Sequence, residues 1–138
     1  MIEKKYLAQI IATDNDGLQV ISACTAGAKV KVSDIKYLAK NKVFLLSILR
    51  TKIETDQENE KVNSICRFDF VDKVKSKNID QKNNKLELEL IAIDYLKNQS
   101  DYEINLIFKN NAHIALTTDT IEVRLEDQNE IKTNENNK

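Results

Sequence analysis

Apolar positions near the start of the chain predict one strand followed by one helix. The strand is expected over residues 5–13, because its apolar run stops at a polar Asp-Asn-Asp string. The helix is expected over residues 17–26, where apolar side chains recur every three or four positions. Asp16 can cap its start, with Gln19 as the partner in a capping box. Gly27 follows where a helix end favours a left-handed residue.

From Val30 onward, apolar and polar positions alternate with the period of a β-strand. Residues 43–49 are apolar on both faces, so we expect a central strand that is covered on both sides. A strand over residues 65–74 is predicted to point Cys66, Phe68 and Phe70 inward. Further alternating strands are expected at residues 86–93, at residues 102–108 and from residue 112 onward.

Polar segments separate these strands. Residues 55–61 and 78–84 predict exposed loops. The pair Asn110-Asn111 predicts a two-residue turn, because asparagine tolerates a positive φ angle better than most residues.

The segment over residues 120–127 fits two interpretations. Ile121, Val123 and Leu125 alternate as in a strand, whereas Asp119 followed by Glu122 resembles a helix cap. We favour a short helix that packs on the sheet.

This order of elements predicts an α+β domain over residues 1–128 and a disordered polar tail over residues 129–138. Short connections favour a mainly antiparallel, strongly bent sheet or roll, with one helix after the first strand. A closing helix near residue 120 would make the roll similar to the pleckstrin-homology type.

Composition narrows the functional classes. The chain has 138 residues, enough for one domain, and its 21 Lys and Arg against 22 Asp and Glu disfavour a dedicated nucleic-acid binder. Its two glycines lie on either side of the predicted helix, which excludes a glycine-rich phosphate loop. Cys24 and Cys66 stand alone, as reduced cytosolic thiols do, and no apolar run is long enough for a membrane helix. We therefore expect a cytoplasmic protein that makes no membrane contact.

Candidate catalytic and metal-binding residues are weak. The string Asp14-Asn15-Asp16-Gly17 resembles a calcium loop but lacks the required later Glu. His113 is the single histidine and has no nucleophile or metal-binding companion in the sequence. Glu87 and Glu89 share one strand face and are expected to face lysines of a neighbouring strand. We therefore expect no catalytic residue, no metal and no cofactor.

One strand face is basic. Arg67, Lys73, Lys75 and Lys77 follow one another at odd positions, and we add Arg50 to this candidate binding set. Such a face can contact phosphates or an acidic partner. It can equally be an edge strand that lysines protect against aggregation.

Several strings, taken in order, resemble a family of uncharacterised alphaproteobacterial proteins, domain-of-unknown-function family 2948. These strings are Asp16-x-Leu18-x-Val20-Ile21-Ser22-Ala23, Val30-Lys31-Val32-x-Asp34-Ile35, Arg67-Phe68-Asp69-x-Val71, Lys75-Ser76-Lys77-x-Ile79-Asp80 and Ile104-x-Leu106-Ile107-Phe108. The resemblance covers almost everything except the tail. It implies a single domain and basic residues like Lys75 and Lys77, but no mechanism.

Two functions follow as expectations. The first is a small, non-enzymatic binding or protein-interaction module, with a protein partner or a second copy of itself. The alternative is a small-ligand or nucleic-acid binder that uses Arg50 and the Arg67–Lys77 face.

Overall fold

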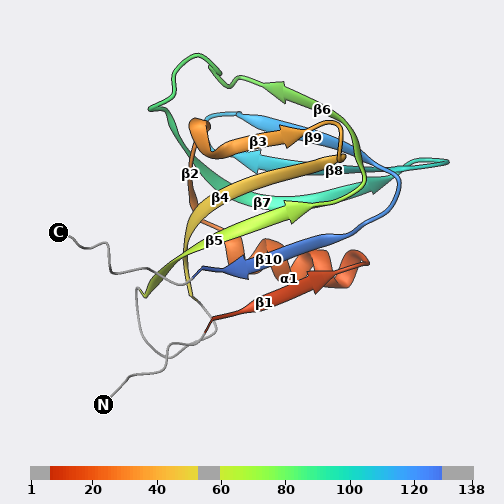
Figure 1. The fold of residues 1–138 in the computed structure, drawn as a ribbon, viewed down its shortest axis with the longest axis horizontal. Helices are drawn as coiled ribbons and strands as arrows, with labels where there is room; N and C mark the ends of the chain where they lie inside the picture. Colours follow the sequence, from red (N-terminus) through yellow and green to blue (C-terminus); the bar gives the residue numbers. More distant parts are fainter. Residues whose placement is uncertain (1–6, 53–59, 129–138) are drawn as a thin grey trace.

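A strongly bent antiparallel sheet contains most of the chain in the computed structural model, which describes residues 7–52 and 60–128 (Figure 1). The elements are β1 (Gln9–Ala12), α1 (Asn15–Thr25), β2 (Lys29–Lys31), the short 3-10 helix η1 (Val32–Asp34), β3 (Ile35–Leu38), β4 (Val43–Thr51), β5 (Lys61–Phe68), β6 (Val71–Lys77), β7 (Glu87–Lys97), β8 (Tyr102–Phe108), β9 (His113–Thr118) and β10 (Val123–Asp127). This arrangement confirms the expected α+β class.

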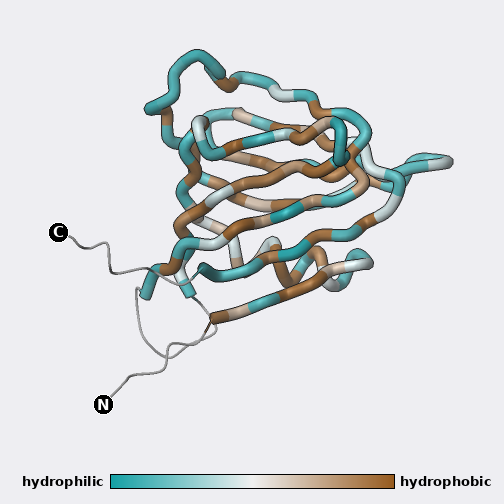
Figure 2. The backbone as a smooth tube through the Cα atoms, viewed as in Figure 1, coloured by the Kyte–Doolittle hydropathy of each residue, from teal (hydrophilic) through white to brown (hydrophobic). Residues whose placement is uncertain are grey.

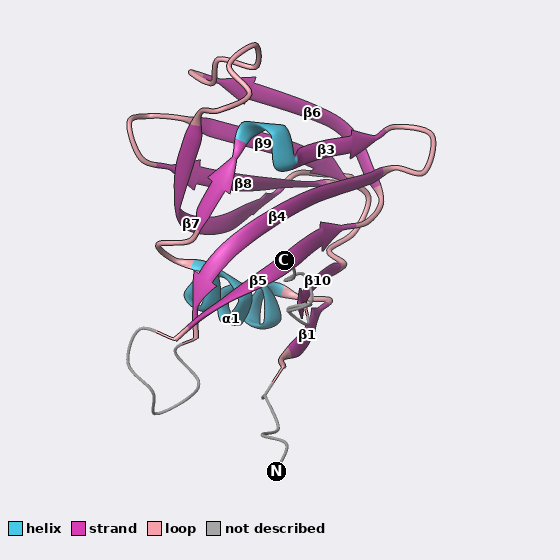
Figure 3. Ribbon diagram, turned by 60° about the vertical axis from the view of Figure 1, so that its left-hand side comes forward, coloured by secondary structure: helices cyan, strands magenta, loops and turns pink. Residues whose placement is uncertain are grey.

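One short strand, β2, lies in the middle of the sheet order. The strand order is β1-β10-β5-β4-β2-β7-β8-β9-β6, and β3 pairs separately with β4. The short strand β2 joins β4 to β7, and thus connects the two halves of the sheet. The helix α1 lies at one end of the molecule and β6 at the other (Figures 1 and 3).

A sharp corner divides the single strand that we expected over residues 65–74, so that prediction was wrong. The chain turns at Phe70, which has a φ of 60°. The β9–β10 connection bends beside it, because Asp69 N–H donates to Glu122 O at 3.0 Å and Asp119 N–H to Phe70 O at 3.3 Å. Phe70 is 45% exposed rather than inward. The alternating pattern continues across the corner, so it gave no sign of the break.

Within the segment at residues 120–127, residues 123–127 form a strand, so the expected closing helix was wrong. β10 lies between β1 and β5, with Leu125 opposite Ile10 and Cys66. The alternation favours a strand over a helix, because it buries Ile121, Val123 and Leu125 on one face. Within the described residues, the roll therefore lacks the terminal helix of the pleckstrin-homology type.

The helix is confirmed, but it begins two residues earlier than expected. Asp14, not Asp16, is the N-cap, and its Oδ1 accepts from Gly17 N–H at 2.8 Å. Gly17 also lies close to β1, since a Cβ there would come within 2.9 Å of Ala12 Cα. Gly27 ends the helix with a φ of 85°, as the sequence indicated.

The buried core joins one face of the sheet to α1, and apolar residues recur along most of the strands (Figure 2). In β4, Phe44, Leu46 and Ile48 are buried on that face, whereas Leu49 on the other face is 38% exposed. The expectation that both faces of this strand are covered was therefore wrong. The alternating run from Val30 is also interrupted, because η1 separates β2 from β3.

The predicted connections fall partly within the described residues. Asn110 and Asn111 both have a φ of 63° and form the expected turn between β8 and β9. Residues 78–84 form the expected loop. Most of the loop predicted at residues 55–61, and the tail predicted at residues 129–138, lie outside the described residues, although Lys61 already belongs to β5. No helix in the described ranges is long and apolar enough to cross a membrane.

Candidate functional site

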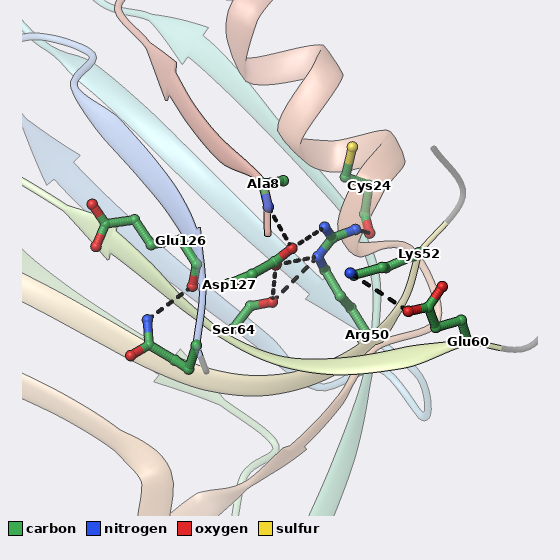
Figure 4. Close-up of polar contacts among 9 residues, drawn as sticks. Ala8, Cys24, Arg50, Lys52, Glu60, Ser64, Glu126 and Asp127 are labelled. Atoms are coloured by element: carbon green, nitrogen blue, oxygen red, sulfur yellow. Dashed lines mark hydrogen bonds and ion pairs between the residues drawn. The ribbon is translucent and has the colours of Figure 1, made fainter. Parts of the chain in front are cut away.

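Arg50, one of the five basic residues proposed for binding, is buried rather than on the surface. Its side chain points inward from β4 beneath the C-terminal end of α1, and the residue is 1% exposed (Figure 4). The sequence contained a signal for this. Position 50 continues the period-two series Phe44, Leu46 and Ile48, which forms the buried face of the strand.

The Arg50 guanidinium forms a buried ion pair with Asp127 of β10. Its Nη2 lies 3.1 Å from Asp127 Oδ2, and its Nε lies 3.1 Å from Oδ1. Nη1 donates to the carbonyl oxygen of Cys24 at 3.4 Å, at the end of α1. The cation therefore satisfies a helix-end carbonyl and a carboxylate together.

Asp127 receives two further hydrogen bonds. Ser64 Oγ donates to its Oδ1 at 2.6 Å, and Ala8 N–H donates to its Oδ2 at 2.8 Å. Burial alone would raise the pKa of Asp127, but the hydrogen bonds from Arg50, Ser64 and Ala8 outweigh it and lower this pKa. We call Arg50, Ser64 and Asp127 the Arg50 cluster. It connects β4, β5, β10, the end of α1 and the start of β1.

A second ion pair lies just after the end of β4. Lys52 is 2% exposed, and its Nζ lies 3.6 Å from Glu60 Oε2. Two buried cations therefore lie close together in sequence, Arg50 on β4 and Lys52 just after the strand ends. Both cations are paired with carboxylates, as buried charges require. Because its charges are paired within the fold, the Arg50 cluster is a structural feature that holds several elements together.

The remaining four basic residues do not form one face. Arg67 lies on β5 before the corner, and its Nε donates to Asp69 Oδ1 at 3.0 Å. Lys73, Lys75 and Lys77 lie on β6 after the corner, are exposed, and form no ion pair within the described residues. The structure therefore brings together three of the five predicted residues and separates the other two.

The other candidates have ordinary structural partners. Glu89 lies opposite Lys29, whose Nζ is 2.6 Å from Glu89 Oε1, and this hydrogen bond lowers the pKa of Glu89. The expectation that these glutamates face lysines is confirmed. His113 Nε2 lies 2.8 Å from Asn105 Oδ1. Cys24 and Cys66 are both buried, and burial raises the pKa of Cys66 to about 12.

An apolar cleft lies between β3 and β6, at the end of the molecule away from α1. It has a volume of about 350 Å³. Its apolar lining comprises Val32, Ile35, Tyr37, Phe44, Val74, Ile79 and Ile114. Ser76 and Gln81 add polar groups, and Gln81 Nε2 donates to Ser76 Oγ at 2.7 Å. We call this the β3–β6 cleft.

Three contacts close one end of the β3–β6 cleft. Tyr37 Oη donates to Val71 O at 2.8 Å, and Val71 N–H donates to Lys42 O at 2.8 Å. Lys42 Nζ also lies 2.9 Å from Asp72 Oδ1. Beyond these contacts the two strands diverge, so the cleft opens along the rest of β6. Sequence reasoning did not find it, because residues 35–37 and 74–76 meet only through the bend of the sheet.

Comparison with known proteins gives a family. The model of the family described as "Protein of unknown function (DUF2948)" matches residues 8–138. The chain belongs to this family, which confirms the resemblance seen in its sequence. No curated protein and no solved structure matches the chain.

Proposed function

We propose that this member of the DUF2948 family is a non-enzymatic protein-interaction module of the cytoplasm, and that the β3–β6 cleft is its binding site. The observation that carries this proposal is the apolar lining of the cleft between two strands that each have one unpaired side. A concave apolar surface with a few polar groups is the usual character of a binding site. Open strand edges add backbone donors and acceptors for a protein ligand.

The polar groups of the β3–β6 cleft favour binding over catalysis. Catalysis by acid–base or nucleophilic steps needs a nucleophile and a base in reach of a cavity. The β3–β6 cleft instead offers the hydroxyls of Ser76 and Tyr37, and each already has a hydrogen-bond partner. Neither hydroxyl has a histidine or carboxylate as that partner. We therefore assign the cleft to recognition.

Nucleic-acid binding is the weaker candidate. Lys73, Lys75 and Lys77 support it, since unpaired lysines can contact phosphates. Arg67 is already paired with Asp69, and Arg50 is buried. Phe68 is fully buried, so it cannot stack on a base. Three lysines on one strand form only a small basic surface for contacts with phosphates.

A peptide-display selection tests the proposal. A library of random peptides is selected on the wild-type protein, and the selected peptides are then measured on Ser76→Tyr, which places a ring in the cleft. Ser47→Tyr is the matched control, because Ser47 is an exposed serine on β4 outside the cleft. We expect selected peptides to bind Ser76→Tyr at least about tenfold more weakly, and Ser47→Tyr as well as the wild type.

Equal binding to all three proteins would overturn the cleft as the binding site. Thermal unfolding of both variants confirms that they remain folded. Light scattering over a range of protein concentrations tests whether the protein self-associates. A dimer that Ser76→Tyr dissociates, and Ser47→Tyr does not, would support the cleft with a second copy as the partner.

A further inference from the structure

We infer that the ligand of the β3–β6 cleft is an extended acidic segment of another protein, which adds to the outer edge of β6 as a further strand. This inference rests on the proposed function, because it names the ligand class of the same cleft. It is carried by three features of the described residues: an unpaired strand edge, an alternation of side chains along it, and lysines without carboxylate partners.

The outer edge of β6 is open. β6 is the last strand in the sheet order, and among the described strands it pairs with β9 alone. Within the described residues, the backbone hydrogen bond between Val71 and Lys42 is the only one on that edge, at its very start. The backbone groups of Lys73 to Lys77 that point away from β9 therefore have no strand partner within the described residues. Such an edge is a template for pairing with another chain.

The side chains of β6 divide into two kinds. Val74 and Ser76 line the cleft, whereas Lys73, Lys75 and Lys77 alternate with them and point to the opposite face. A strand added beside β6 would follow the same alternation. One set of its side chains would enter the apolar cleft, and the other set would lie beside the three lysines.

The second wall of the cleft has the same arrangement. On β3, Ile35 and Tyr37 line the cleft, and Lys36 between them is exposed. Lysines therefore border both open strands on the face away from the cleft. Opposite charges on neighbouring strands stabilise pairing, and like charges destabilise it. The complementary ligand alternates apolar residues with Asp or Glu.

The closed end of the cleft limits the ligand. Tyr37 and Lys42 bond to Val71, so an added strand can pair only beyond that point, along Lys73 to Lys77. The ligand is therefore a short extended segment that pairs with these few residues, rather than a long strand of a folded domain. A nucleic acid could contact the lysines, but it has no alternating apolar side chains to fill the cleft.

The test uses a short synthetic peptide in which Glu alternates with Val or Ile, and a control peptide of the same composition with the Glu residues in one block. Binding is measured by titration calorimetry and by amide hydrogen exchange of β6. We expect the alternating peptide to bind more tightly and to slow exchange in β6. Two further peptides carry N-methyl groups on alternate amides. The two peptides differ in which alternate amides are methylated, and only one of the two sets of N–H groups would point toward β6. The peptide methylated on that set should lose binding, and the other peptide should retain it.

Charge reversal supplies the second arm. Lys73→Glu/Lys75→Glu should bind the alternating peptide about tenfold more weakly than the wild type. Lys61→Glu/Lys97→Glu is the matched control, since it makes the same change in net charge at two exposed strand lysines elsewhere. It should bind nearly as well as the wild type, and added salt should weaken the complexes of the wild type and of this control, because it screens the attraction between lysine and glutamate.

The outcomes separate this inference from the proposed function. Equal loss in both double variants, equal binding of both composition-matched peptides, or indifference to N-methylation would overturn strand addition by an acidic segment. If display-selected peptides still depended on Ser76 in that case, the cleft would remain a binding site for another kind of ligand. Binding of single-stranded RNA that outcompetes the peptide at Lys73 and Lys75 would also overturn the inference.

Discussion

At the scale of single residues, the most consequential interaction is the buried ion pair between Arg50 and Asp127. Both side chains are fully buried. Taking charges out of water costs several kcal/mol for each ion, and the pair is tolerated because its hydrogen-bonding groups are satisfied by one another, Ser64, Ala8 and Cys24. The pair therefore fixes the arrangement of elements more than it adds to stability.

Removing one partner should destabilise the protein strongly. We expect Arg50→Met to lower the free energy of unfolding by about 3–5 kcal/mol, because Asp127 would remain as an unpaired buried charge. The double variant Arg50→Met/Asp127→Leu should recover much of this loss. Urea unfolding measures both. Arg67→Met, which breaks an exposed pair, is the control and should cost less than about 1 kcal/mol. Equal losses in the single and double variants would contradict this account.

The same carboxylate predicts how stability depends on pH. The folded-state pKa of Asp127 is lowered, so the folded state favours its ionised form more than the unfolded chain does. The resulting stabilisation is complete above the unfolded aspartate pKa of about 3.9, and it is lost as the pH falls through the lower folded value.

Unfolding in urea at a series of pH values checks this. Asp127→Asn should be less stable than the wild type at pH 7, and the difference should shrink as the solution becomes acidic. Asp94→Asn is the control, because Asp94 is exposed on β7 and has no ion pair among the described residues. A difference that stays constant down to acidic pH would argue against an ionised Asp127 in the folded state.

At the scale of elements, turns show how local chemistry sets the path of the chain. The β8–β9 turn places both Asn110 and Asn111 at a φ of 63°. Asparagine and glycine adopt this conformation readily, whereas a β-branched residue does not. With no proline and two glycines in the chain, asparagine takes this role in the tight turn.

Substitution in this turn should follow backbone preference. We expect Asn111→Val to cost about 1–2 kcal/mol of unfolding free energy, and Asn111→Gly to be neutral or slightly stabilising. Thermal unfolding compares the two variants. Leu96→Val on β7 is a control for the β-branched side chain, because Leu96 is exposed in an extended strand. If Asn111→Val were as stable as Asn111→Gly, the turn conformation would have to differ.

Element types were predictable from the sequence wherever the pattern is local. The period of α1, its Gly27 end and the Asn110-Asn111 turn depend on neighbours in the chain, so they were found. The corner at Phe70 was missed, because its partner segment at residues 119–122 is distant in sequence. The strand at residues 123–127 was misread for the same reason. Its place between β1 and β5 is visible only in the sheet order.

At the scale of the whole molecule, the candidate site arises from the bend of the sheet. The period-two position of Arg50 is a local signal of its burial, but its pairing with Asp127 spans 77 residues and has no such signal. The β3–β6 cleft depends on the angle at which the sheet bends. The sequence therefore pointed to the lysines of β6 without showing the apolar surface beside them.

The reactivity of the Cys66 thiol measures how often the sheet opens. Cys66 lies on β5 between β4 and β10 and is 1% exposed, and burial raises its pKa to about 12. Alkylation by iodoacetamide needs an exposed thiolate. We therefore expect Cys66 to react in native buffer only as fast as the sheet opens, and rapidly in urea. Mass spectrometry of the labelled peptide measures this rate. Fast labelling in native buffer would indicate local opening of β5.

The pairing of β1 with β10 has a consequence for synthesis on the ribosome. The first and the last described strands are neighbours, and Ala8 bonds to Asp127 across 119 positions of sequence. Until β10 has emerged, β1 lacks its neighbour and Arg50 lacks its carboxylate. Contacts of such long range form slowly, and the open edges of β1 and β5 are exposed in the meantime. The nascent chain thus carries a cation in its future interior, which opposes stable collapse before the sheet can be completed.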